Sequence, residues 1–544
     1  MDHQNRNISL VAARDGVLPG PDLHDGISPG GAEVPHSAGP EKHFATEHLR
    51  SNLGGRAISG GFVTALAQGA RFALYFISTI ALSRLLSKED FGLVAMVGVL
   101  ISFLRIFREA GLSTATVRHD KITHAQVSNL FWANVALGTV AALVGAAVSP
   151  VMAWFYRDPR LVIVTVLLSS TFLLSGAAVQ HLALLNRQMR FKAMALVDVG
   201  SMTFGLVVGV VMALKGYGYW SLVGSQLGTS FGELILAWSV CHWRPQLPKS
   251  RSGTRGLLKF GASLTYDSLL RRVTGGADTL LIGRYYGAGP LGIYTRGMAL
   301  IMRPLDQFVT PFDMVFVPIL SRLQDQPERY RRIFLHVFGA IAMAGFPLAG
   351  ILLGLSRPLV LVLLGARWTE VTPVFAALAL VALYYPLVCV TFWLLTTQGR
   401  TKDIMGLGTL ISVISVTSYC IGLPHGVVGV AVAFSFSGLL IRLPAQFFIV
   451  GRLGPVSQGD LWRVFLCHLP LWGVPLGIVY LTQILLSGAT PFVQIAVGVP
   501  AGALAALAVI GVIPHQLRMA QRILKEVLGF IGRRPNESPV APFA

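Results

Sequence analysis

Charged and polar side chains interrupt several long apolar stretches of this 544-residue chain. A charged group in the hydrocarbon core of a bilayer costs at least about 2.5 kcal/mol, so such residues are expected to serve a purpose. Guanidinium groups present a planar fork of donors that fits phosphate. The arginines among them outnumber the acids that could neutralise them, which predicts a site for an anion. The residues concerned are Gln68, Arg71, Asp267, Arg271, Arg272, Asp278, Arg296, Arg303, Asp306, Asp313 and Arg442.

Ion pairing between or within helices is the alternative interpretation of the same residues. Asp267 lies four positions before Arg271, so the two would share one face of a helix. Arg303 and Asp306 offer a second pair. For any single residue, pairing and anion binding stay equally open. For the group, the surplus of arginine favours anion binding.

The elements that carry these residues follow from hydropathy. Hydrophobic residues make up 53% of the chain and charged residues 13%, about half the share usual in soluble proteins. Apolar blocks of roughly 20 residues would cross the hydrocarbon core as helices. The sequence predicts an all-α integral membrane protein with about 14 transmembrane helices. We expect these helices near residues 60–82, 91–107, 127–149, 160–184, 194–214, 218–241, 260–282, 291–318, 333–355, 372–396, 404–422, 427–450, 464–486 and 492–514.

The distribution of lysine and arginine predicts the topology. The net charge of +19 could suggest nucleic acid, but the cations concentrate in the two terminal regions and in every second loop. This is the bias of cytoplasmic segments in membrane proteins. Both termini are therefore predicted to be cytoplasmic, and nucleic acid is not an expected partner.

A weak internal repeat divides the chain into similar halves. Both copies would begin on the same side, so we expect two parallel six-helix repeats plus a terminal helix pair, an arrangement suited to alternating access. The matched residues are Leu184, Leu185, Gln188, Arg190 and Lys192 with Leu394, Leu395, Gln398, Arg400 and Lys402, and Arg84 and Gly92 with Arg284 and Gly292. The expected domains are a disordered cytoplasmic tail (1–56), an N-terminal six-helix lobe (57–250), a C-terminal six-helix lobe (251–455), an additional helix pair (456–514) and a basic amphipathic cytoplasmic tail (515–544).

The eighth segment carries three prolines, Pro304, Pro311 and Pro318, at seven-residue spacing. Each removes a backbone hydrogen bond from a helix. In lipid such breaks are tolerated where protein or a water-filled cavity supplies partners. We expect this helix to form a cavity wall, either flexible or statically bent.

Four stretches of sequence resemble a known family. They read LSRLLSKEDFGLV at 82–94, REAGLSTA at 108–115, NLFWAN at 129–134 and DTLLIGRYYG at 278–287, with LGIY at 291–294. They are similar to the Wzx/WzxC-type lipopolysaccharide and exopolysaccharide flippases of the multidrug/oligosaccharidyl-lipid/polysaccharide (MOP) exporter superfamily. The likeness covers roughly residues 55–455, and the extended N-terminal tail departs from the family pattern.

The resemblance implies a function. Such proteins flip undecaprenyl-diphosphate-linked oligosaccharide repeat units across the bacterial inner membrane, for exopolysaccharide, capsule or O-antigen, by alternating access around an electropositive cavity. Coupling to a proton or sodium gradient or to the membrane potential is expected, without a cofactor. The implied partners are lipid-linked oligosaccharide and membrane lipids, with a polysaccharide polymerase and a chain-length regulator as further candidates. The implied substrate-binding residues are Arg71, Arg271 and Arg303, then Arg272, Arg296, Arg442 and Gln68, and the ion-coupling candidates are Asp267 and Asp278.

Two other functions stay open. A drug or ion antiporter of the same superfamily would need a cavity dominated by acids, which the excess of arginine disfavours. A membrane polysaccharide polymerase or ligase would need a large periplasmic loop with catalytic residues, whereas the loops here are short. No Walker loop, HExxH or Cys-x-x-Cys pattern occurs, so neither an enzyme nor a metal site is predicted.

Overall fold

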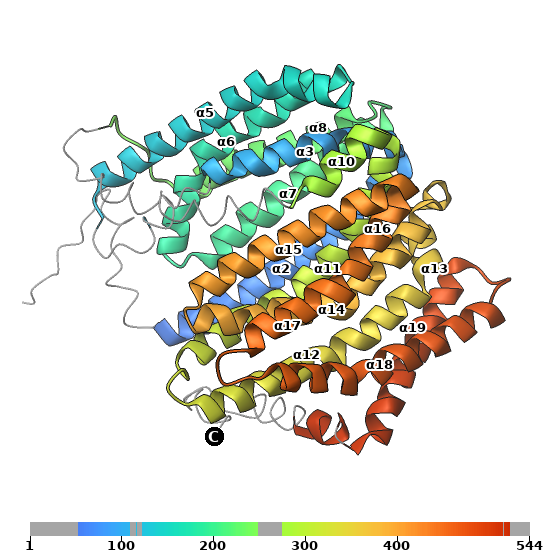
Figure 1. Ribbon diagram of the computed structural model, residues 1–544. Coiled ribbons are helices and arrows are strands. Elements are labelled where there is room, and N and C mark those ends of the chain that lie inside the picture. Colours follow the sequence, from blue (N-terminus) through green and yellow to red (C-terminus); the bar gives the residue numbers. More distant parts are fainter. Residues whose placement is uncertain (1–52, 109–115, 117–121, 249–274, 515, 523–544) are drawn as a thin grey trace, which may run out of the picture.

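The computed structural model describes residues 53–108, 116, 122–248, 275–514 and 516–522, and among these helices are the only regular secondary structure. Figure 1 shows the long helices running side by side. The first set is α2 (Leu53–Leu85), α3 (Lys88–Arg108), α5 (His124–Tyr156), α6 (Arg160–Arg187), α7 (Phe191–Leu214) and α8 (Trp220–Val240). The second is α10 (Ala277–Tyr286), α11 (Ala288–Ser321), α12 (Pro327–Gly354), α13 (Ser356–Leu363), α14 (Val371–Thr397), α15 (Thr401–Gly422), α16 (Gly426–Ser437), α17 (Leu443–Gly451), α18 (Gln458–Leu485) and α19 (Pro491–Val512).

Nine helical stretches of the described ranges are long and apolar enough to cross a membrane. One of them, Thr401–Gly451, has 51 residues, and a straight helix of that length would measure about 75 Å, more than twice the hydrocarbon thickness. A turn at Leu423–His425, followed by Gly426 with a φ of 76°, divides it into α15 and α16, which pack on each other. Every predicted segment is matched by a helix except the one at 260–282, which lies largely outside the described residues.

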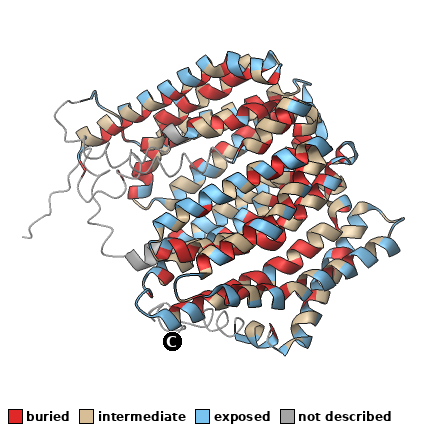
Figure 2. Cartoon of the chain, in the orientation of Figure 1, coloured by how far each residue is buried: buried red, intermediate tan, exposed pale blue. Residues whose placement is uncertain are grey.

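Large apolar side chains cover the outward faces of several helices. Figure 2 shows exposed residues along the outer sides of the bundle. Trp154 of α5 is 78% exposed and Val512 of α19 is 79% exposed. Soluble monomers rarely expose so much contiguous apolar surface, whereas helices in lipid do so without cost. The prediction of a multi-pass, all-α membrane protein is confirmed.

Helix α14 is the central element of the later helices. Of its apolar window, 72% is buried inside the protein, the highest share of any span in the described residues. It packs against α11, α12 and α16. The core around it contains the fully buried rings of Phe334, Phe338, Phe375 and Phe447. A helix buried on all sides provides a fixed support for its neighbours, among them α11.

Two glycines allow α3 and α11 to cross with their backbones in contact. A Cβ atom on Gly92 would lie 1.7 Å from the carbonyl oxygen of Ala288, and one on Gly292 would lie 2.0 Å from that of Lys88. Any larger residue would therefore push the two helices apart. The two contacts are reciprocal. Gly292 lies 200 positions after Gly92, and Ala288 lies 200 positions after Lys88, so each glycine contacts the residue four positions before the other.

The turns after α6 and α14 share one backbone geometry. Met189 and Gly399 occupy the left-handed region, with φ of 52° and 66°. In each turn the next residue, an arginine, donates its backbone N–H to a leucine carbonyl five positions earlier, over 3.0 Å and 2.9 Å. The arginine side chains also act alike, since Arg190 reaches the carbonyl of Val240 and Arg400 that of Val450. These partners again differ by 210 positions.

Candidate functional site

Two arginines of α11 rest on aromatic rings supplied by α2 and α3. The guanidinium carbon of Arg303 lies 5.6 Å from the ring centre of Tyr75, and that of Arg296 lies 4.0 Å from the ring centre of Phe91. Arg296 and Arg303 are seven residues apart, which places them on the same side of the helix about two turns apart. Ring faces attract cations, and they do so without neutralising the positive charge.

Helix α2 completes this cluster. Gln68, Arg71 and Tyr75 recur at the spacing of one helical face. Arg71 forms an ion pair with Asp198 of α7 at 3.4 Å, but both side chains are nearly half exposed. Ion pairs that are exposed to water contribute little to stability. We call Gln68, Arg71, Tyr75, Arg296 and Arg303 the arginine face.

The positive charge of the arginine face is only partly neutralised. Within the described part of the chain, Arg296 and Arg303 have no carboxylate partner. Asp306, three residues after Arg303, instead accepts a hydrogen bond from the Tyr385 hydroxyl at 2.7 Å. The ion pair between Arg303 and Asp306 that the sequence left open does not form in this structure. The arginine face therefore has donors to offer an anion.

Helix α11 holds both arginines despite its three prolines. It remains one helix over the 34 residues Ala288–Ser321, with Pro304, Pro311 and Pro318 inside it. A side-chain contact with a neighbouring helix also holds α11 in place. Asp313 accepts a hydrogen bond from the Trp393 indole of α14 at 2.5 Å, which ties the proline-rich part of α11 to the central helix.

Arg442 lies in a different environment. It ends a π-helical turn, Gly438–Arg442, between α16 and α17, and it is buried. Its guanidinium group donates to the Tyr384 hydroxyl at 3.1 Å, the Ser415 hydroxyl at 3.3 Å and the Phe434 carbonyl at 2.5 Å. The same group lies 4.0 Å from the Phe434 ring centre. Its two Nη groups are engaged with α14, α15 and α16, apart from the arginine face.

Asp278 occupies the first turn of α10 and is buried. Its carboxylate accepts hydrogen bonds from the Tyr294 hydroxyl at 3.0 Å and from the Thr279 backbone N–H at 2.6 Å. The carboxylate thus joins α10 to α11. The other predicted site residues of this region, Asp267, Arg271 and Arg272, lie outside the described residues.

The structure adds residues that the sequence interpretation overlooked. Asp198 and Tyr75 contact the predicted arginines directly. A pocket of about 220 Å³ between α3, α6 and α8 is lined by Arg105 and Glu233. Arg105 lies inside the predicted segment 91–107 and Glu233 inside 218–241. Their position within apolar segments was the available signal for both residues.

Three polar contacts join the end of α2 and the start of α3 to α13 and to the connection between α13 and α14. Lys88 pairs with Glu370 at 2.5 Å. Arg84 donates to the carbonyl of Val362 at 2.9 Å, and the Trp368 indole donates to the carbonyl of Ser83 at 2.7 Å. Together with the α3–α11 crossing, they hold early and late helices together at one end of the bundle.

Comparisons with known proteins identify the family. The family model described as "Polysaccharide biosynthesis protein" matches residues 81–373, more than half of the chain. The lipopolysaccharide biosynthesis protein WzxC of Escherichia coli (strain K12) is 25% identical over 445 residues, which cover 79% of this chain and 89% of WzxC.

Solved structures share the fold. The lipid II flippase MurJ in an inward closed conformation superposes with a TM-score of 0.65, at 14% identity, over 87% of this chain and 99% of MurJ. An inward-facing multidrug resistance MATE family transporter of the MOP superfamily gives 0.55, also at 14% identity, over 72% of this chain and 95% of the transporter. The resemblance noted from the sequence motifs is confirmed, and this chain belongs to the polysaccharide biosynthesis protein family.

Proposed function

We propose that this protein is a flippase that carries undecaprenyl-diphosphate-linked oligosaccharide units across the bacterial inner membrane for polysaccharide synthesis. Membership of the polysaccharide biosynthesis family supports this role. So does the fold, which is that of a protein named as a lipid II flippase. In this proposal the diphosphate binds the arginine face, while the lipid tail stays in the bilayer.

The observation that carries the proposal is the unneutralised charge of α11. Arg296 and Arg303 lie on one side of the helix, rest on aromatic rings and have no carboxylate partner among the described residues. A diphosphate offers several acceptor oxygens to such donors. Arg71 would join them by leaving Asp198, because an exposed ion pair is weak. Arg271 and Arg272 extend the proposal to the segment before α10.

Alternating access is the proposed mechanism. The reciprocal contacts of Gly92 and Gly292 and the paired turns after α6 and α14 support two parallel six-helix repeats, spanning residues 57–250 and 251–455, within about 14 helices. The end of the bundle that holds the Lys88–Glu370 pair is poor in cations, so we assign it to the periplasmic side. At this end the pair would close the cavity. Opening there, with closure at the other end, would release the cargo outside.

Energy coupling belongs to the same proposal. A carboxylate that changes partners between two states can couple transport to an ion gradient. Asp278 fits this role because it is buried at the junction of α10 and α11. Asp267 is the second candidate. A polymerase and a chain-length regulator would act on the cargo after release.

Depleting the protein in its host tests the proposed function. We expect a polyprenyl-diphosphate-linked oligosaccharide to accumulate on the cytoplasmic side while surface polysaccharide disappears. Lipid extracts analysed by mass spectrometry, with leaflet assignment by a membrane-impermeant sugar-binding probe, would measure both changes. Unchanged lipid-linked intermediates, with sensitivity to drugs or salt instead, would contradict the proposal and favour an antiporter. Re-expression of the intact chain is the control.

A further inference from the structure

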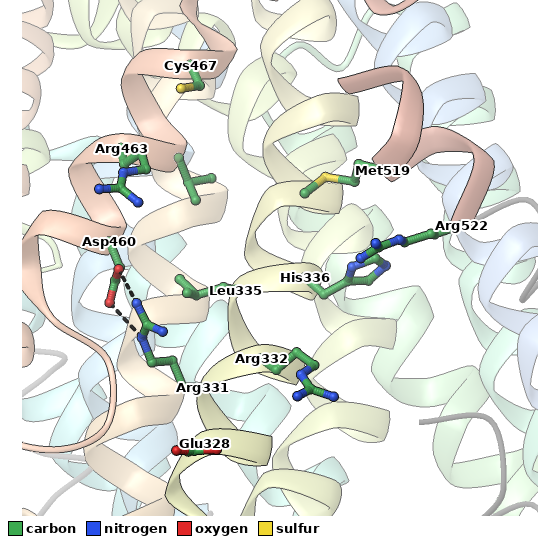
Figure 3. A pocket seen from close by; sticks show the side chains of 11 residues that line it. Glu328, Arg331, Arg332, Leu335, His336, Asp460, Arg463, Cys467, Met519 and Arg522 are labelled. Atoms are coloured by element: carbon green, nitrogen blue, oxygen red, sulfur yellow. Dashed lines mark hydrogen bonds and ion pairs between the residues drawn. The ribbon is translucent and has the colours of Figure 1, made fainter. Parts of the chain in front are cut away.

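A cationic hollow of about 700 Å³ is lined by residues none of which belongs to the arginine face. It opens between the first turns of α12, the first turns of α18 and the helical residues 516–522, as Figure 3 shows. None of α2, α3 and α11 contributes to its lining. We call it the α12–α18 hollow. Its charged lining residues include Glu328, Arg331, Arg332, Asp460, Arg463 and Arg522.

The charges of the α12–α18 hollow do not balance. Arg331 binds Asp460 through two hydrogen bonds, from Nε at 3.0 Å and from Nη2 at 2.6 Å. Arg332, Arg463 and Arg522 are exposed and make no ion pair or hydrogen bond with any described residue. Among the described lining residues, four guanidinium groups stand against two carboxylates, which gives this part of the lining a net charge of +2.

The third wall of the hollow is packed in place. The Gln516 side chain is fully buried and donates to the carbonyl of Cys467 at 2.9 Å. Met519 lies against Gly339, where an added Cβ atom would come within 2.7 Å of it. Arg522, one helical turn later, therefore faces the hollow from a fixed segment.

The hollow lies at the border between polar and lipid-facing surface. Leu335, Val464 and Met519 line its apolar side. Leu466, one turn beyond Arg463 on α18, is 56% exposed, and further apolar residues of α18 are exposed beyond it. An occupant with a charged head in the hollow would thus find an apolar surface beside it for its chains.

We propose that the α12–α18 hollow binds the head group of a membrane lipid that carries two phosphate charges. The net charge of +2 matches such a head group, and guanidinium forks suit phosphate oxygens. Basic pockets at the membrane surface recognise lipids of this kind. Two sources share this chemistry: cardiolipin, and a polyprenyl diphosphate. The inference does not depend on the transport proposal, because no residue of the arginine face is involved.

Native mass spectrometry of the full chain in detergent tests this site. The protein is titrated with cardiolipin, with undecaprenyl diphosphate and with zwitterionic phosphatidylcholine. The test variant combines Arg332→Gln with Arg463→Gln. The matched control is Arg329→Gln, because Arg329 lies on the same turns of α12, outside the lining, and contacts Gln326. We expect the double variant to bind the doubly charged lipids at least about tenfold more weakly, and the control to bind like the unmodified chain.

The outcomes separate the two sources. Tight, arginine-dependent binding of cardiolipin would identify a site for a resident phospholipid, and such binding of undecaprenyl diphosphate a docking point for the cargo. The proposal would be overturned if the unmodified chain, the double variant and the Arg329→Gln control bound the doubly charged lipids with equal affinity. It would also be overturned if phosphatidylcholine bound as tightly as those lipids. If the double variant fails to fold, Arg332→Lys with Arg463→Lys replaces it. Lysine keeps the positive charge but lacks the planar fork of guanidinium donors, so the affinity for the doubly charged lipids is expected to fall about threefold.

Discussion

Arg303 and Arg442 both lie in helices of the apolar bundle, yet their surroundings are opposite. Arg303 is exposed, touches the ring of Tyr75 and has no carboxylate partner among the described residues. Arg442 is buried and donates to Tyr384, Ser415 and Phe434. The same residue type thus has two different surroundings: Arg442 ties three helices together, whereas the donors of Arg303 make no hydrogen bond with any described residue. Position in an apolar segment does not separate these roles.

The largest effect is expected from removing Arg303, which has no carboxylate partner among the described residues. Arg303→Ala should lower export of the polysaccharide about 30- to 1000-fold, because a charged contact with a buried phosphate is worth about 2–4 kcal/mol. Membrane abundance should stay normal, since Arg303 makes no hydrogen bond in the described structure. Surface polysaccharide per cell, normalised to protein level, measures the effect. Arg157→Ala, at an exposed loop position, is the control. Normal export by Arg303→Ala would remove the distinction between the two arginines.

A loss of stability rather than of function is expected at Arg442. Arg442→Ala would leave the Tyr384 and Ser415 hydroxyls and the Phe434 carbonyl without their donor, at a cost of about 2–4 kcal/mol. The melting temperature in detergent and the amount of protein in the membrane should fall. Export per folded molecule should change little. A variant with normal melting behaviour and no export would instead place Arg442 in the substrate site.

The smallest effect is expected at Asp198, where the substitution should strengthen ligand binding rather than cause a loss of function or stability. Asp198→Asn removes the carboxylate that competes for Arg71. An exposed pair is worth about 0.2–1 kcal/mol, so binding of an anionic lipid should become up to about fivefold tighter. Titration of the purified chain with undecaprenyl diphosphate would measure this gain. Weaker binding would show that Asp198 positions Arg71 rather than competing for it.

The helical plan was predictable because it depends on local properties. Apolar runs of bilayer length and the polar turns between them indicated α5, α6, α7 and α12 before any contact was known. The recurrence of Gln188 and Arg190 as Gln398 and Arg400, 210 positions later, also indicated an internal repeat. These features are set by neighbours in the sequence, which is why hydropathy and spacing reveal them.

The contacts of the arginines were not predictable in the same way. Tyr75 lies 228 positions from Arg303, and Asp198 lies 127 positions from Arg71. No pattern within a segment indicates which distant helix will supply the partner. Asp306 illustrates the limit, because its nearest cation in sequence was Arg303 and its actual partner is Tyr385 of α14.

The sequence alone determined that this chain is a helical membrane protein, which residues break its apolar segments, and which family it resembles. The first two follow from the cost of exposing backbone and charge to lipid, a cost that each segment meets by itself, and the third follows from short sequence motifs. The tertiary structure decided which arginines are engaged and which keep free donors. It also placed α12, α18 and residues 516–522 around one cationic hollow. Burial and pairing depend on helices brought together from distant parts of the chain, so only the folded protein assigns them.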